Sequence, residues 1–387
     1  MLDCGIIKLV SVGDICNVSR GASPRPIKKY LTQSGEGVPW IKIGDVSPFD
    51  KYIKKTNERI TQEGAKKSRF LHKGDLILSN SMSFGRPYIL EIDGCIHDGW
   101  ISLSGFENYV LRDFLYEVLN TKCVQDYWAM KANNGGAMSN LNSDIVKSTI
   151  IKIPSLNVQE EIVKILDSFT NLIDALNEEL SLRQKQFEYY REKLLTFDDK
   201  SINVNITPLG EIGNVCMCKR IMRNETNNEG GIPFYKIGTF GGIADSFISK
   251  DKFEEYKNKY NYPKLGDILI SASGTIGKTV VFDGKPSYYQ DSNIVWIDND
   301  ETKVINSFLR YIYTVIDWKV DDGGVIKRLY NTNIRSTLIT YPKEKAVQQS
   351  IVEKLDAFES LISSLKEEIA LRQKQYEYYR EKLLTFD

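Results

Sequence analysis

One loop of this sequence carries the residue types of a phosphate-binding site. Residues 272–279 read Ala-Ser-Gly-Thr-Ile-Gly-Lys-Thr and satisfy a relaxed phosphate-loop pattern after a predicted strand. A phosphate loop must open into a helix whose N-terminus faces the phosphates, whereas residues 280–286 predict a strand and a turn. The matching loop earlier in the chain, residues 80–87, keeps Gly85 but lacks the Lys-Thr pair. We therefore expect a polar hairpin loop in both places.

Other residues that could carry catalysis are scarce. The two histidines, His72 and His97, are too few for a His-based triad or a His-rich metal site. The carboxylates Asp98 and Asp291 stand in matching places and are interpreted as turn or strand-end residues. The sequence contains no methyltransferase signature, metal-nuclease carboxylate cluster or nucleophile elbow. These residues therefore favour a non-enzymatic protein, with no catalytic residue and no metal site predicted.

Polar, basic and aromatic residues in the predicted loops favour contact with nucleic acid. Arg, Lys, Asn and Gln side chains can read base edges, and Ser, Thr and Lys commonly bind phosphates. A solvated surface role is the plainer interpretation of any single residue, so the hypothesis depends on the collective pattern. The candidates in the first half are Arg20, Ser23, Arg25, Lys28, Lys29, Lys42, Ser81, Ser83, Arg86, Asn133 and Asn134. In the second half they are Lys219, Arg220, Arg223, Tyr235, Lys236, Ser273, Thr275, Lys278, Gln290, Lys327 and Arg328.

Bulk composition limits the class of function. Lys+Arg 51 balance Asp+Glu 51, whereas a protein that bound phosphates strongly by itself would usually be basic. We expect a partner to carry part of the electrostatics. The sequence has no apolar run long enough to span a membrane and lacks the pattern of a signal peptide. Its six cysteines lack C-x-x-C spacing, which favours reduced thiols in a cytoplasmic protein without a membrane partner.

The elements that position these residues occur twice. Residues 158–198 match residues 347–387 without gaps, with 28 identities in 41 positions at a fixed offset of 189. Within this match, residues 181–198 and 370–387 agree at 16 of 18 positions. An internal repeat of this length indicates one structural unit written twice.

The globular parts that precede the two matching segments share framework strands. Residues 38–44 are echoed by residues 232–238, and residues 74–79 by residues 266–271, while the stretches between them differ. We predict an α+β fold with two similar mixed α/β domains, separated by two long helices that form an antiparallel coiled coil with pseudo-two-fold symmetry. The expected boundaries are 1–156 and 199–346 for the globular domains, and 157–198 and 347–387 for the helical regions.

The coiled-coil prediction comes from a seam of apolar residues at 3-4 spacing, interrupted only by Arg183 and Arg372. Each helix of about 40 residues would be roughly 60 Å long. A short polar segment, residues 199–207, leads from the first helix to the second globular domain, so the second helix must run back antiparallel. The seam comprises Leu166, Phe169, Ile173, Leu176, Leu180, Phe187, Tyr190 and Leu194, and then Leu355, Phe358, Ile362, Leu365, Ile369, Tyr376, Tyr379 and Leu383.

Some apolar residues of the helices lie off this seam. Leu182 and Tyr189 recur as Leu371 and Tyr378, and these four residues are the candidate partner-binding positions. A two-helix pair cannot cover them, and exposed apolar patches usually mark interfaces. The same prediction of exposed apolar surface extends to Leu172, Leu361, Leu195 and Leu384.

This order of elements resembles the specificity (S) subunit of type I restriction-modification enzymes, across essentially the whole chain. The resemblance is carried by the paired Leu-Arg-Gln-Lys-Gln runs at 182–186 and 371–375, and by Val-Gln-Glu and Val-Gln-Gln where the two repeated segments begin. Gly-Asp-Ile-Leu-Ile-Ser at 266–271 with Gly-Thr-Ile-Gly at 274–277 adds to it. The first half departs from the pattern at residues 81–86, where Gly-Thr-Ile-Gly is not kept.

The resemblance implies a DNA-recognition role without an active site. Each globular part would be a target-recognition domain that reads one half of a split sequence in double-stranded DNA, with the coiled coil setting the gap. Two methyltransferase (M) subunits would dock on the helices and heads, and motor-nuclease (R) subunits would join them for restriction. S-adenosylmethionine, ATP and magnesium would belong to these partners, as would the flipped adenine.

Two other functions stay open on the sequence alone. The first is a non-catalytic tandem-repeat scaffold whose globular parts bind proteins, with the coiled coil as a spacer. Salt-sensitive, sequence-dependent DNA binding in the presence of a methylase would separate the recognition hypothesis from this one. The second is an enzyme that uses residues 274–279 on a nucleotide. ATP turnover that is lost in Lys278→Ala would support it.

Overall fold

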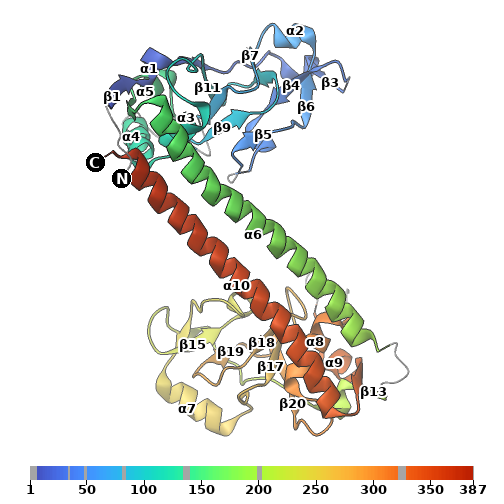
Figure 1. Cartoon of the computed structure of the whole chain (residues 1–387). Coiled ribbons are helices and arrows are strands. Elements are labelled where there is room, and N and C mark those ends of the chain that lie inside the picture. The colour runs from blue at the N-terminus through green and yellow to red at the C-terminus, as the bar shows by residue number, and fades with distance from the viewer. Residues whose placement is uncertain are drawn as a thin grey trace. The chain divides into compact units, whose positions relative to one another are not determined.

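The computed structural model describes residues 7–33, 35–47, 50–80, 84–133, 140–197, 203–320 and 328–386, with Asn133 described only in its backbone (Figure 1). The chain forms two compact units, Met1–Asn177 with Glu367–Asp387, and Glu178–Lys366. Each unit combines one globular region with parts of both long helices. We refer to residues 7–155 as head 1 and to residues 203–344 as head 2.

Head 1 contains two five-stranded sheets and one two-stranded sheet. Hydrophobic side chains from the larger sheets form its core, and the helices cover them. The indole NH of Trp100 donates to the carbonyl of Ile41 at 3.1 Å, and that of Trp128 to the Thr149 hydroxyl at 2.7 Å. In sheet order the strands are β2 (Asn17–Arg20), β11 (Trp100–Ser104), β8 (Leu76–Ser79), β9 (Pro87–Leu90) and β5 (Tyr52–Ile53); β3 (Leu31–Thr32), β6 (Glu58–Ile60), β4 (Val38–Ile41), β10 (Gly94–Ile96) and β7 (Arg69–Leu71); and β1 (Lys8–Ser11) with β12 (Ile150–Ile153).

The helices of head 1 are short. The predicted helix over residues 111–132 is broken near Thr121, as expected from its sequence, into α3 and α4. The α-helices are α1 (Val12–Ile15), α2 (Gln62–Ala65), α3 (Arg112–Leu119), α4 (Lys122–Asn133) and α5 (Ser143–Lys147), and the 3-10 turns are η1 (Ile27–Lys29) and η2 (Ile43–Asp45).

Head 2 repeats this plan with fewer strands. Its sheets are β14 (Gly213–Cys216), β20 (Ile294–Asn299), β17 (Ile268–Ser271) and β18 (Thr279–Val281); β16 (Phe247–Ile248), β15 (Ile232–Tyr235) and β19 (Tyr288–Tyr289); and β13 (Val204–Pro208) with β21 (Leu338–Pro342). Its helices are α7 (Lys250–Lys259), α8 (Asn306–Val315) and α9 (Asn331–Ser336), with the turns η3 (Leu209–Glu211), η4 (Arg223–Glu225) and η5 (Ile237–Thr239). Because β13 begins at Val204, part of the segment predicted as a linker is a strand.

Two strand pairs of head 1 recur in head 2. The parallel pair β4·β10 of head 1 has its counterpart in β15·β19, and the antiparallel pair β1·β12 in β13·β21. The loop of residues 272–278 joins the antiparallel strands β17 and β18, which confirms the predicted hairpin in place of a phosphate loop. The repeat read from the sequence is therefore a repeat of the fold.

The long helices α6 (Leu156–Thr196) and α10 (Lys345–Leu384) contain 41 and 40 residues. Phe169 stacks on Tyr379 in the first unit, with ring centroids 5.3 Å apart, and Tyr190 stacks on Phe358 in the second at 5.5 Å. An offset of 189 converts each stacked pair into the other with the two helices exchanged. This exchange is the pseudo-two-fold relation expected for an antiparallel pair of repeated helices.

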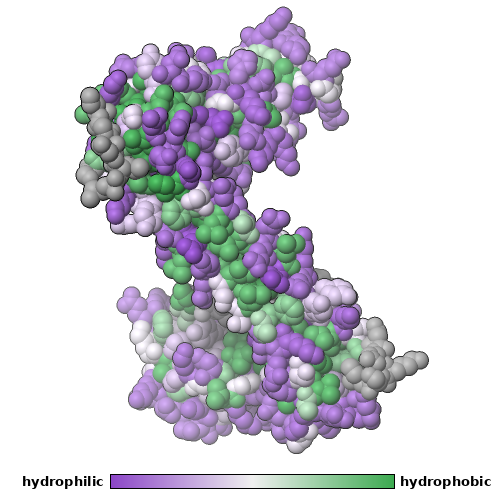
Figure 2. All heavy atoms as spheres, viewed as in Figure 1, coloured by the Kyte–Doolittle hydropathy of each residue, from purple (hydrophilic) through white to green (hydrophobic). Residues whose placement is uncertain are grey.

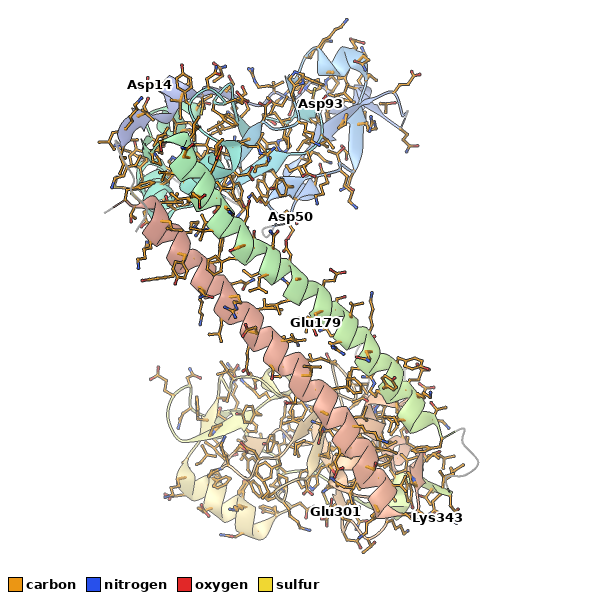
Figure 3. All side chains as sticks on the ribbon, viewed as in Figure 1. Asp14, Asp50, Asp93, Glu179, Glu301 and Lys343 are labelled. Carbon is orange, nitrogen blue, oxygen red and sulfur yellow. The ribbon has the colours of Figure 1, made fainter. Side chains whose placement is uncertain are left out.

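The arginines that interrupt the seam are held on their own helices. The Arg183 guanidinium lies 3.3 Å from Glu179, which Figure 3 labels on α6, and it donates to Gln186 at 3.0 Å. Arg372 repeats this arrangement on α10 with Glu368 at 2.8 Å and Gln375 at 2.9 Å. Since these side chains are satisfied along the helix surface, the seam can continue past them.

A buried glutamine joins each long helix to its head. The amide oxygen of Gln159 accepts from the backbone NH of Leu111 at 2.9 Å, and its NH₂ group donates to Pro154 at 3.0 Å. Gln348 makes the same contacts with Ile305 at 2.9 Å and with Pro342 at 2.7 Å. These matched bonds align α3 of head 1 with α8 of head 2 residue by residue.

The C-terminal ends of α6 and α10 pack into the hydrophobic cores of the heads. Leu384 lies in the core of head 1 and Leu195 in the core of head 2, with exposed fractions of 6% and 7%. The prediction that these two leucines contribute to an exposed surface is therefore wrong, because each inserts into a head that the helix periodicity alone does not reveal. Leu172 and Leu361 are exposed, as predicted.

Candidate nucleic-acid interface

Three predicted contact residues of head 1 gather around Asp98. The Ser23 hydroxyl donates to the Asp98 carboxylate at 2.7 Å, and the Arg25 guanidinium lies 3.5 Å from the other carboxylate oxygen. The Arg20 guanidinium donates to the backbone carbonyl of Asp98 at 3.0 Å. The Ser23 hydrogen bond holds the pKa of Asp98 below its usual value. A charged carboxylate thus keeps a serine and an arginine oriented at the end of β2.

This arrangement requires close approach of two backbone segments. A Cβ atom on Gly21 would lie 2.0 Å from the carbonyl oxygen of His97. Only glycine therefore lets the loop after β2 pass beside the residues before β11. The Asn80 side chain, which the sequence analysis did not select, donates to the same Asp98 carbonyl at 2.9 Å.

The remaining described candidates of head 1 are spread over its loops. Lys28 and Lys29 are exposed on η1, and Arg86 lies in the β8–β9 hairpin, where its backbone NH donates to the Ser79 hydroxyl at 3.2 Å. Asn133 is the last residue of α4. The candidates Ser81, Ser83, Asn134 and Lys327 lie outside the described residues.

A second cluster lies in head 2, where the hairpin β17–β18 meets the chain at Arg328. The Arg328 guanidinium donates to the Ser292 hydroxyl at 2.8 Å and lies 3.4 Å from the Asn293 side-chain oxygen. That same oxygen accepts from the Ser273 hydroxyl at 2.9 Å. Sequence reasoning missed Ser292 and Asn293, although both directly follow Asp291, the counterpart of Asp98.

Other candidates of head 2 lie on neighbouring loops. Thr275 and Lys278 are exposed in the β17–β18 hairpin, and the Lys278 ammonium donates to the carbonyl of Phe240 at 2.5 Å. Lys219 lies over the ring of Tyr260 at 5.3 Å. Arg220 and Arg223 are exposed, and Tyr235 stacks on Tyr289 with a centroid distance of 5.6 Å.

The two heads share one turn that begins with a lysine. The backbone NH of Lys42 donates to the Asp45 carboxylate at 2.8 Å, and that of Lys236 to the Thr239 hydroxyl at 3.1 Å. Each ammonium group has an acidic neighbour: Lys42 lies 2.5 Å from Glu58, and Lys236 lies 2.8 Å from Asp245.

The next NH of each turn is held by a different side chain. In head 1 the backbone NH of Ile43 donates to Nε2 of His97 at 3.2 Å, and in head 2 that of Ile237 donates to Gln290 at 2.9 Å. Burial lowers the pKa of His97, so its imidazole is neutral and can accept this bond near neutral pH. The predicted contact residue Gln290 therefore positions the turn that carries Lys236.

The described residues offer little reactive chemistry. Among them, no group of three or more His, Cys, Asp or Glu side chains is arranged to hold a metal ion. Burial raises the pKa of the Cys16 and Cys218 thiols to about 12, which suppresses the reactive thiolate. None of the helices in the described ranges is long and apolar enough to cross a membrane.

A family model for the type I restriction modification DNA specificity domain matches residues 7–182 and again residues 202–371. The chain belongs to this family. A putative type I restriction enzyme specificity subunit from Haemophilus influenzae is 55% identical over 403 residues, covering 100% of this chain and 97% of its own length. The predicted family resemblance is therefore confirmed.

Solved structures show the same fold. The HsdS subunit from Thermoanaerobacter tengcongensis aligns with a TM-score of 0.52 at 16% identity, covering 98% of this chain and 95% of that chain. A chain from a study of the assembly and conformational transition of the type I R-M system aligns with a TM-score of 0.65 at 16% identity, covering 98% and 97%.

Family membership confirms the central functional expectations. The chain is a DNA-recognition subunit of the type I restriction-modification class, and DNA and the other subunits of such a system are its partners. As a specificity subunit it is a non-catalytic component. The alternative of a protein-binding scaffold is not favoured by these relatives.

Proposed function

We propose that each head reads one half of a split target in double-stranded DNA and that α6 and α10 fix the distance between the half-sites. The supporting observation is a contrast between the heads. The lysine-bearing turn and its strands recur, whereas the side chains around them differ. Arg20 lies two residues after Val18 of β2, whereas Met217 lies two residues after the matching Val215 of β14. A shared frame with different loops suits two heads that perform one task on two sequences.

The same contrast assigns roles to the candidate residues. Lys42 and Lys236 occupy equivalent positions in both heads, so we assign them to phosphate contacts that carry no sequence information. Arg25 in head 1 and Arg328 in head 2 belong to clusters that differ between the heads, so we assign them to base edges. Asp98 lies 3.5 Å from the Arg25 guanidinium, and Ser292 accepts from that of Arg328 at 2.8 Å, so each guanidinium has a neighbour that can orient it.

We further propose that two methyltransferase subunits dock on the long helices. Leu182 and Leu371 are 58% and 61% exposed, and Tyr189 and Tyr378 are 59% and 60% exposed, so the same apolar positions are open in both copies. Figure 2 shows hydrophobic residues on the surface of the long helices. A partner that recognises one copy can recognise the other, which supports two partner molecules for each chain.

A groove beside one of these tyrosines supports the same proposal. In the second unit, the end of α6 and the start of α10 form an open groove of ≈ 930 Å³ lined by Tyr189, Leu194, Val347 and Ile351, among others. The outer faces of the two-stranded sheets repeat a further apolar pair, Leu9 with Ile150 and Ile206 with Leu338, all more than half exposed.

The full assembly would contain motor-nuclease subunits and act in the cytoplasm. The name of the Haemophilus influenzae relative as a restriction enzyme subunit supports the first part. Five cysteines free of disulfide bonds within the described ranges support the second.

Methylation-sensitive sequencing of DNA modified by the complex with its methyltransferase subunits tests this proposal directly. The expected result is a motif of two short specified half-sites separated by unspecified base pairs, about one helical turn between their centres or slightly more. An uninterrupted motif, or methylation without sequence preference, would contradict the division of labour between the heads. Exchanging the residues of head 2 should change only one half-site.

A further inference from the structure

The two copies of the repeated helix end differ at one residue that packs against a head. Residues 181–198 and 370–387 differ only as Ser181 against Ala370 and as Phe187 against Tyr376. Ser181 is exposed. Tyr376 packs on the core of head 1, and Phe187 packs on the core of head 2. The Phe/Tyr difference therefore lies where each head receives the end of a long helix.

The Tyr376 hydroxyl is the hydrogen-bond donor to a buried carboxylate. It donates to Oε2 of Glu117 at 2.7 Å, and Glu117, on α3, is only 1% exposed. The other oxygen, Oε1, has no hydrogen-bond partner among the described residues, and the Lys51 ammonium lies 4.0 Å from it. A buried carboxylate that loses its donor is left strongly destabilised. Head 1 therefore requires a hydroxyl at this position of the helix.

The equivalent position in the second unit has no such requirement. The matched glutamine bonds align Glu117 with Tyr311 of head 2, whose hydroxyl donates to Asp356 at 2.6 Å. The Phe187 ring lies near the Phe358 ring, with centroids 6.5 Å apart, and the Arg191 guanidinium lies over it at 5.5 Å from the ring centroid. An apolar ring suffices at this site.

Apart from Leu180 against Ile369, the other seam positions carry the same residue types on both helices. If α6 paired with α6 of a second molecule, Phe169 would stack on Tyr190, and α10 with α10 would stack Phe358 on Tyr379. These are the same residue types as in the stacked pairs within one chain. A closed assembly of two chains would therefore keep the seam, but it would place Phe187 of the second copy against Glu117.

We propose that the Glu117–Tyr376 hydrogen bond is a pairing-specificity contact, through which head 1 accepts the end of α10 and rejects the near-identical end of α6 from a second copy of this chain. Single buried polar residues set partner choice in coiled coils in the same way. The contact penalises the wrong pairing twice, because a closed assembly contains two copies of head 1.

Co-expression of full-length chains with two different affinity tags tests the proposal, with the fraction of mixed complexes as the readout. Glu117→Leu combined with Tyr376→Phe replaces the polar pair with apolar groups, and the mixed fraction should rise at least about tenfold over wild type. Phe187→Tyr keeps every contact of the first unit but supplies a hydroxyl on the wrong helix, and it should also raise the mixed fraction.

Ser181→Ala removes the other difference between the copies and is the matched control, for which the mixed fraction should equal that of wild type. The proposal fails if Phe187→Tyr leaves the mixed fraction at the wild-type level. It also fails if Ser181→Ala raises the fraction as much as the test variants do. Because Phe187→Tyr leaves the buried pair intact, it gives an answer even when the double variant does not fold.

Discussion

Arg25 and Arg328 show how individual side chains can be prepared for a ligand. A free arginine samples many rotamers and loses that freedom on binding. Here each guanidinium group already has an acceptor on its own head, Asp98 for Arg25 and Ser292 for Arg328. Under the proposed assignment to base edges, these contacts would complete part of the ordering before DNA is bound, and a guanidinium group has five N–H donors in all.

Single-residue variants should separate base contacts from phosphate contacts. Arg25→Ala should relax preference at one base pair of the half-site read by head 1, at a cost of about 1–3 kcal/mol against the preferred base. Lys42→Ala should weaken binding to all sequences alike and reduce the salt slope of log K by about 1. Binding of the assembled complex to a set of singly substituted duplexes, over a salt series, measures both.

Arg328→Ala and Lys236→Ala are the matched variants in head 2. Their effects should fall on the other half-site and on the salt slope, respectively. Relaxed preference at a single base pair in Lys42→Ala, or uniform weakening in Arg25→Ala, would reverse the assignment.

Glu117 should make the stability of the first unit depend on pH. Burial raises its pKa above the ordinary value, even though Tyr376 and Lys51 favour the charged form. The folded chain therefore holds a proton that the unfolded chain has lost, and the free energy of unfolding decreases as pH rises from about 4.5 through the raised pKa. Glu117→Gln should lose less stability than wild type as pH rises above about 4.5 in denaturant unfolding.

Glu63→Gln is the control for this measurement, since Glu63 is an exposed carboxylate of the same head. Its stability should follow the wild-type pH dependence. Parallel curves for Glu117→Gln and wild type would show that Glu117 does not titrate in this range.

Among the elements, the long helices combine a constant surface with variable neighbours. Asp167 of α6 accepts an ion pair from Lys51 at 3.3 Å, whereas its counterpart Asp356 of α10 accepts one from Arg310 at 3.0 Å. The cation comes from a different place in each head, since Lys51 directly precedes β5 whereas Arg310 lies on α8. The two helices therefore present the same carboxylate at equivalent positions, and each head pairs it with a cation from a different part of its structure.

Mutation of the exposed apolar positions should separate partner docking from folding. Leu182→Glu with Tyr189→Glu places charges on a surface that the heads do not cover, so both heads should stay folded while a methyltransferase subunit is lost. Native mass spectrometry of the reconstituted complex gives the subunit count, and circular dichroism gives the fold. The corresponding variant at Leu371 and Tyr378 should lose the other copy.

Lys185→Glu is the control, because it changes charge at an exposed polar position of the same helix. Its complex should keep the full set of subunits. Full assembly of the Leu182→Glu, Tyr189→Glu variant would limit α6 to a spacer role.

Periodicity explains why the sequence predicted the helices well and their end contacts poorly. The 3-4 spacing identified the seam and the exposed face, including Leu182 and Tyr378, because both follow from one helix alone. The burial of Leu195 and Leu384 depends on a head that closes over the helix end, and no local pattern encodes it. The clusters at Asp98 and Arg328 were missed in part for the same reason, since loops far apart in sequence build them.

At the scale of the whole molecule, the helices should act as a ruler for the DNA target. One heptad inserted after Glu179 and another after Glu368, positions that correspond in the repeat, adds about 10 Å to each helix. The preferred spacer should lengthen by about three base pairs, at 3.4 Å per base pair. Methylation-sensitive sequencing of DNA modified by this variant measures the spacer.

Insertion of a heptad into α6 alone is the control, because it shifts the seam of one helix against the other and should impair folding. An unchanged spacer in the double insertion would contradict the ruler.

The buried glutamines Gln159 and Gln348 and the helix ends that reach the opposite head have a consequence for how such a chain can diverge. Each helix copy begins at one head and ends at the other, so nearly the same sequence has to fit two different neighbours. Contacts with both heads therefore limit which substitutions either helix copy can accept. One of the differences between the copies, Phe187 against Tyr376, falls at such a contact, because only Tyr376 has a hydroxyl that can donate to Glu117.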